Sequence, residues 1–125
     1  MSMITSSTMH DCSVSSHGNI SLAIAELTLS PTAENDVVEI LHIPKGLKLV
    51  GFRIMTSGLG VDVKLDLKVG DTLLAAGIDA AEVCELVKPL IPVTLEHSET
   101  LTVTIKGGVA TGKLTVMPEY IADGY

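Results

Sequence analysis

The chain has 125 residues, of which 46% are hydrophobic, and it carries 15 Asp and Glu against 8 Lys and Arg. This length and apolar content are enough for one folded domain and exclude an acidic disordered tail. The formal net charge of −7 repels phosphate, and aromatic residues at 2% are too few for base stacking, so no nucleic-acid partner is expected.

Residues 1–18 are rich in Ser and Thr and show no sustained hydrophobic period, which predicts an extended N-terminal arm ahead of a β-sandwich domain at residues 19–125. We expect a neighbouring subunit to hold this arm. The arm lacks the apolar stretch of a signal peptide, which favours assembly in a cytoplasm. No apolar run approaches the length of a membrane span, so no membrane partner is expected.

From Ile20 onward, short β-prone runs alternate with turn signals. The predicted strands cover residues 20–29, 37–43, 47–55, 61–68, 90–96, 100–105 and 113–117. Proline or glycine should end the first four runs, at residues 30–32, 44–46, 56–58 and 69–71. The pattern predicts an all-β fold, an antiparallel β-sandwich or jelly roll of about seven to eight strands.

The clearest alternation is in residues 61–67. There Val61, Val63, Leu65 and Leu67 should face the core, and Asp62, Lys64 and Asp66 should face water. Later runs repeat the pattern with inward positions at Leu101, Val103, Ile105, Leu114 and Val116. Because the chain has almost no aromatic residues, the core should consist of Val, Leu, Ile and Ala.

Residues 79–87 fit two structures. Asp79 with Glu82 three positions later resembles a helix capping box, and the alanines between them favour a helix. Val83 and Val87 fit a strand equally well. The balance slightly favours one short helix or helical turn. Pro92, in the run that follows, indicates an edge strand or a bulge.

Residues 107–113, GGVATGK, match part of a phosphate-binding loop. Leu114 stands where the magnesium-binding Ser or Thr should be, and a strand pattern follows where a helix is needed. We therefore expect a hairpin loop between two strands.

His10, Asp11 and Cys12 are three possible metal ligands in a row, with His17 nearby. Adjacent residues in an extended chain point in opposite directions, so a polar arm is the expected reading. Cys12 and Cys84 have no metal-type spacing and are expected to be free thiols.

His42 and His97 are isolated in the sequence, and Asp62 and Asp66 belong to an outward strand face. We therefore expect no catalytic, cofactor-binding or metal-ligating residues, no cofactor and no enzymatic activity. A Ser–His–Asp site assembled from distant loops stays open as an alternative.

Several segments within residues 43–120 carry a family resemblance: IPKG at 43–46, the run 47–55, DLKVGDT at 66–72, LAAGID at 74–79, and LTVTIKGG, GKLTV and EY within 101–120. On these segments the chain resembles the tailed-bacteriophage head decoration (cement) proteins of the small β-sandwich or jelly-roll type. The shared motifs are turn and strand signatures, and none of them is catalytic.

The resemblance implies a virion structural protein that decorates or cements the capsid by binding between major capsid protein subunits. It also implies self-association as a trimer or dimer, and a place on the capsid surface after assembly in the host cytoplasm. Two alternatives stay open: another phage structural module, such as a head-fibre base or tail component, and a carbohydrate-binding β-sandwich. The scarcity of aromatic residues for stacking sugars weakens the second.

Overall fold

The computed structural model describes residues 3–5 and 20–122. The strands in this part of the chain are β1 (Met3–Thr5), β2 (Ile20–Leu22), β3 (Ala25–Thr32), β4 (Val37–Ile43), β5 (Leu47–Ser57), β6 (Lys64–Val69), β7 (Thr72–Asp79), β8 (Val83–Thr94), β9 (Glu99–Lys106) and β10 (Ala110–Ala122). The same part contains no helix, and so no helix able to cross a membrane.

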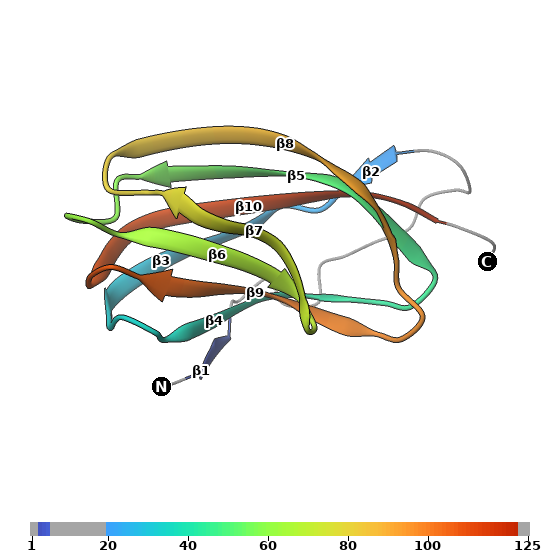
Figure 1. The fold of residues 1–125 in the computed structure, drawn as a ribbon, viewed down its shortest axis with the longest axis horizontal. Helices are drawn as coiled ribbons and strands as arrows, with labels where there is room; N and C mark the ends of the chain where they lie inside the picture. The colour runs from blue at the N-terminus through green and yellow to red at the C-terminus, as the bar shows by residue number, and fades with distance from the viewer. Residues whose placement is uncertain (1–2, 6–19, 123–125) are drawn as a thin grey trace.

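The strands form two sheets (Figure 1). Sheet A has the order β1-β4-β9-β6-β7, and sheet B has the order β2-β10-β5-β8, with β3 also paired to β10. Between β3 and β10 the antiparallel pairs are nested: β6 with β7, β5 with β8, β4 with β9, and β3 with β10. The chain is thus one long hairpin, with its tip at the β6–β7 turn, rolled up so that successive pairs alternate between the sheets. This is a jelly roll, which confirms the predicted fold class.

The core lies between the sheets and is aliphatic, as predicted. All five positions predicted as inward on the last two runs, Leu101, Val103, Ile105, Leu114 and Val116, are fully buried. Phe52 and Tyr120 are the aromatic members of this core. Each large aliphatic side chain buried in this way contributes about 1.5–3 kcal/mol, so the sandwich is held by many similar contacts.

β2 and β3 are two parts of one strand. Leu22 lies opposite Glu119 and Ala25 opposite Val116, so the register on β10 runs on without a shift. The interruption lies opposite Pro118, which has no N–H to donate, although its carbonyl still accepts from the N–H of Ala23 at 3.3 Å. The predicted run 20–29 is confirmed.

The turn predicted at residues 30–32 is wrong, because β3 continues to Thr32. β3 lies at the edge of sheet B, where a residue without an N–H, such as Pro31, is tolerated. The chain turns instead just before β4, where Asn35 adopts a φ of 71°.

The strand predicted from residue 61 begins three residues later. Val61 is 84% exposed in a turn in which Asp62 has a φ of 63°. The N–H of Val63 closes this turn on the carbonyl of Gly60 at 3.2 Å. Val63, Leu65 and Leu67 are buried as predicted, and the inward placement of Val61 is wrong.

The helix favoured at residues 79–87 is also wrong. Asp79 Oδ1 accepts the N–H of Ala81 at 3.1 Å, which closes a local Asx turn and does not cap a helix. From Val83 onward the chain pairs with β5, beginning opposite Ser57. Pairing with an available strand overrides the weak helix propensity of the two alanines.

β8 is the edge strand that Pro92 indicated, and it also carries a bulge. Pro89 pairs with Gly51 and Val93 with Leu49, so residues 90–92 lie opposite Val50 alone. In Figure 1, β8 runs along the upper margin of the molecule. The sequence pattern does not predict β7, whose pairing with β6 shifts register twice.

Part of the predicted arm pairs with the domain. Met3, Ile4 and Thr5 form β1, parallel to β4, with Met3 opposite Val37. β1 therefore covers the outer edge of β4 in sheet A at residues 37–39. The other arm residues lie outside the described part of the chain.

Candidate interface

The glycine-rich segment 107–113 does not form the expected hairpin loop, because β9 and β10 do not pair with each other. β9 ends at Lys106 in sheet A and β10 begins at Ala110 in sheet B, so the segment crosses from one sheet to the other. Lys113 already belongs to β10, and its backbone N–H donates to Ser57 Oγ at 2.9 Å. Leu114 is buried opposite Thr56 of β5. A phosphate loop needs free amides at the start of a helix, and here the sheet and a serine hydroxyl use the corresponding groups.

The isolated polar candidates have separate places. His42 lies on β4 opposite Thr100, and His97 lies in the exposed turn between β8 and β9. Asp62 is exposed, whereas Asp66 Oδ1 accepts the N–H of Gly77 at 2.9 Å and so ties β7 to β6. Asp66 thus has a structural role beyond the solvated face that the sequence predicts.

Metal-type clustering is absent from residues 3–5 and 20–122, where no three His, Cys, Asp or Glu side chains lie close enough to share an ion. Four of the sequence candidates, His10, Asp11, Cys12 and His17, lie outside these residues. Cys84 is a free, half-buried thiol. Burial raises the pKa of Cys84 above 9.0, and the charges of Asp79 and Glu85 raise it further. A thiol with a raised pKa is a poor nucleophile at neutral pH.

One hollow brings a histidine near acidic residues. It has a volume of about 250 Å³, with Asp71 and Thr72 on one side and His97 and Glu99 on the other. Asp71, Thr72 and His97 are all exposed to solvent. The hollow therefore lacks the enclosure of an ordinary small-molecule site.

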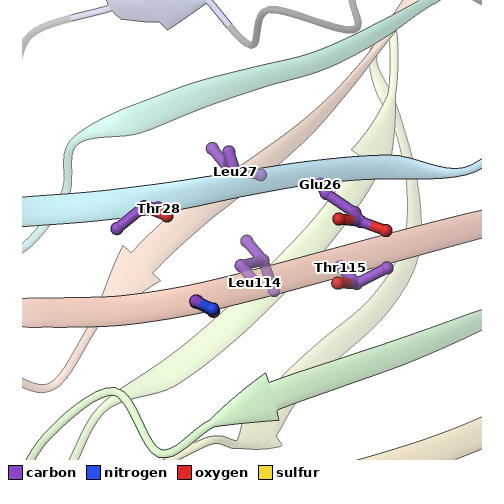
Figure 2. Close-up of a pocket in the computed structure, with 6 residues that line it drawn as sticks. Glu26, Leu27, Thr28, Leu114 and Thr115 are labelled. Atoms are coloured by element: carbon purple, nitrogen blue, oxygen red, sulfur yellow. The ribbon is translucent and has the colours of Figure 1, made fainter.

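A second hollow, of about 360 Å³, lies along the β3–β10 pair (Figure 2). Its lining combines the charged Glu26 and Lys113 with two threonines and two leucines: Thr28, Thr115, Leu27 and Leu114. Figure 2 shows these side chains standing on two neighbouring strands, not converging on a point. The hollow is a feature of the sheet surface.

The outer face of sheet A is polar. Its central strand, β9, presents Thr100, Thr102 and Thr104. Thr102 lies between Glu39 and Lys68, and Thr104 lies opposite Asp66 on β6. Such a face is well solvated and needs no partner.

The outer face of sheet B is different, because it carries six exposed large hydrophobic side chains: Ile20, Leu22, Ile24, Met55, Val83 and Val87. We call these six residues the apolar set. Between them, Arg53 Nη2 lies 3.6 Å from Glu119 Oε2, and the Glu119 carboxylate stands over Gly51. Other charged residues, Glu26, Glu85 and Lys113, are exposed on the same sheet. Several exposed large apolar side chains on one face, among charged ones, are typical of a protein-binding face.

The β2 side of this face carries a signal that our sequence analysis missed. In residues 20–25 the bulky Ile20, Leu22 and Ile24 alternate with Ser21, Ala23 and Ala25. The small alanines face the core, at 4% and 0% exposure, while Ile20 is 70% exposed and Ile24 is 50% exposed. This strand buries its alanines and exposes its isoleucines. Covering these exposed apolar side chains with a protein surface would contribute several kcal/mol of hydrophobic free energy.

The protein belongs to the jelly-roll class of two-sheet folds, and solved phage structures contain chains of similar fold. A chain in the capsid of Ralstonia phage GP4 aligns with a TM-score of 0.77 at 16% identity, covering 98% of this chain and 99% of that one. A chain in the capsid asymmetric unit of cyanophage Pam1 aligns with a TM-score of 0.63 at 16% identity, over 88% and 91% of the two chains.

A chain in the acid-stable capsid of Helicobacter pylori bacteriophage KHP30 aligns with a TM-score of 0.54 at 17% identity, over 85% and 90%. No family model and no curated protein matches the sequence. At these identities the comparisons show a shared fold. Because the coverage is high in both directions, the three capsid chains are also close to this one in length.

Proposed function

We propose that this protein is a bacteriophage virion structural protein without enzymatic activity that decorates or cements the capsid. The observation that carries the proposal is the alignment with the Ralstonia phage GP4 capsid chain along nearly the full length of both chains. That chain is part of a phage capsid, which supports a capsid role for a chain with the same jelly roll.

In this proposal the outer face of sheet B packs against major capsid protein subunits, and the apolar set provides the hydrophobic contact. Four strands about 4.8 Å apart and roughly 30 Å long give this face an area of several hundred Å². A standard interface buries about 800 Å² on each partner, so the face is of the right order. Repetition over a capsid shell allows contacts of modest individual affinity to persist.

The N-terminal arm, residues 1–18, is proposed to add to this contact, and the protein is proposed to self-associate as a dimer or trimer on the capsid surface. An arm and an open strand edge both extend the reach of a small domain by offering backbone hydrogen bonds to a neighbour. Capsid subunits and further copies of this chain are then its partners.

The test is binding of the purified protein to heads of the encoding phage from which the gene for this chain has been deleted. We expect saturable binding at a fixed number of copies per head. Binding to tails but not to heads would support the tail-component alternative. Binding to neither particle would contradict the proposal.

A further inference from the structure

The feature that carries a further inference is the first half of β8, residues 83–88, at the edge of sheet B. A sheet edge presents unpaired N–H and C=O groups, and proteins protect such edges with short strands, prolines, bulges, charges or a covering segment. Among the described strands, β8 pairs with β5 alone.

The other edges of the two sheets are shorter or less regular. β1 has three residues and pairs with residues 37–39 of β4, and β7 is irregular, with two register shifts and a φ of 66° at Gly77. β2 has three residues, and β3 carries Pro31 and Glu26. Each of these devices limits the addition of a further strand.

β8 has prolines and a bulge in its second half only, and its first half carries the two charged residues Glu85 and Lys88. From Val83 to Lys88 it pairs with β5 in a constant register, and the two prolines and the bulge all come afterwards. Val83 and Val87 are 70% and 65% exposed on this regular segment. The segment therefore combines free backbone groups with apolar side chains, as strands that accept another strand do.

The charges beside this edge indicate what it accepts. A hollow of about 600 Å³ is lined by Asp79, Ala81, Glu82, Val83, Cys84 and Glu85. The lining holds three carboxylates and no Lys or Arg. Two of these carboxylates act on the neighbouring thiol: after burial, the charges of Asp79 and Glu85 raise the pKa of Cys84.

We propose that residues 83–88 bind an extended strand of the capsid partner that carries one Lys or Arg residue between two apolar residues on a single strand face. The inference rests on the proposed function for the identity of the partner and deepens it by naming the surface and the chemistry. The incoming strand pairs with the backbone of β8, and its two apolar side chains cover Val83 and Val87. Its cation meets Glu85, which lies between the two valines on the same face of β8, and the charges of Asp79 and Glu82 add to the attraction. A second copy of this chain would bring like charges to the same edge, which disfavours self-pairing there.

The first experiment titrates the full chain with the peptide Thr-Val-Thr-Lys-Thr-Val-Thr, in which two valines and the lysine between them share one strand face, while backbone amide signals are followed by NMR. We expect shifts confined to residues 79–88, weakening as salt is added because the attraction is electrostatic. The same peptide with Glu in place of Lys is the control and should leave these signals unchanged. Shifts elsewhere, or none with millimolar Lys peptide, overturn the inference, and so does equal response to the two peptides.

The second experiment uses variants in the head-binding assay. Reversing charge with Glu82→Lys and Glu85→Lys together should weaken binding at least ~10-fold, and Val87→Lys should do the same because lysine protects an edge. Leu73→Lys is the matched control, since Leu73 is 51% exposed on the edge strand of the other sheet. Unchanged binding by the β8 variants, or equal loss with Leu73→Lys, contradicts the inference.

These experiments distinguish a failure of the proposed function from a failure of the inference about β8. If the wild-type protein does not bind heads but the Lys peptide shifts residues 79–88, the proposed function fails and the strand-accepting edge stands. If the wild-type protein binds heads and the β8 variants bind them equally well, only the inference about β8 fails. Thermal unfolding of each variant ensures that lost binding does not reflect lost folding.

Discussion

At the scale of single residues, the turn that leads into β6 makes the sharpest claim about stability. Val63 is fully buried and Asp62, its neighbour, is exposed. Val63→Asp should destabilise the protein by several kcal/mol, because it buries a charge without a partner. Asp62→Asn should change stability by less than about 0.5 kcal/mol, since asparagine tolerates positive φ well.

Urea unfolding followed by circular dichroism measures both substitutions. Equal losses of stability in the two variants would show that the outward placement of Asp62 is mistaken.

Cys84 supports a prediction about pH. Burial, and then the charges of Asp79 and Glu85, hold the pKa of the folded thiol above 9.0. The folded chain therefore keeps the proton to higher pH than the unfolded chain, so the contribution of Cys84 to stability is full below about pH 9 and is lost as pH rises further.

Thiol labelling with iodoacetamide measures this difference between the folded and unfolded chains, because the thiolate is the form that reacts. In a Cys12→Ser variant, Cys84 should reach half-maximal labelling rate at a higher pH in the native protein than in urea. A lower midpoint in the native protein would mean that a positive charge or a helix terminus acts on the thiol.

At the scale of the elements, Gly107 in the loop between β9 and β10 and Gly77 at a register shift in β7 test how closely neighbouring segments approach. Both glycines have positive φ, at 81° and 66°. A Cβ at Gly107 would collide with the carbonyl oxygen of Asp62, whereas a Cβ at Gly77 meets nothing within 4 Å. Gly107→Ala should therefore cost about 2–4 kcal/mol, and Gly77→Ala only about 1 kcal/mol.

Thermal unfolding of the two alanine variants measures the difference. A similar melting temperature for both would indicate that the turn containing Asp62 can move away from the loop between β9 and β10.

Strands with strict alternation are the elements that the sequence predicts well. Residues 100–105 and 113–117 bury one face completely, so each inward position must be apolar. β7 and the first half of β8 belong to sheet edges, where fewer positions are buried and the selection for alternation is weaker. The helix signal at residues 79–87 is local, and the pairing with β5 that overrides it is a contact between distant parts of the chain.

The candidate interface is harder to predict from sequence, because a pattern of period two does not say which of its two faces is inside. In residues 20–25 the larger side chains are outside, against the usual expectation. The difference between the polar face of sheet A and the apolar face of sheet B depends on pairing across four strands. Sequence alone does not provide that pairing.

At the scale of the whole molecule, the N-terminal arm provides a prediction about assembly. Deleting residues 2–16 removes β1 and with it Ile4, which packs against the core, but it should leave the jelly roll folded, since the fully buried residues in the described part of the chain all follow Leu22. It should lower the number of copies retained on heads at equal protein concentration, because the arm is proposed to extend the contact. Unchanged retention of the truncated chain would count against a role for the arm in binding.

The central claim is that this jelly roll works by contact, with the outer face of sheet B turned toward the capsid. A cryo-electron microscopy map of heads that carry the protein, compared with heads that lack it, tests this claim most directly. We predict added density at a fixed position on the shell, fitted by the jelly roll with Ile24, Met55 and Val87 facing capsid subunits. Heads without such density, or density fitted with the threonine-rich face of sheet A against the shell, would contradict it.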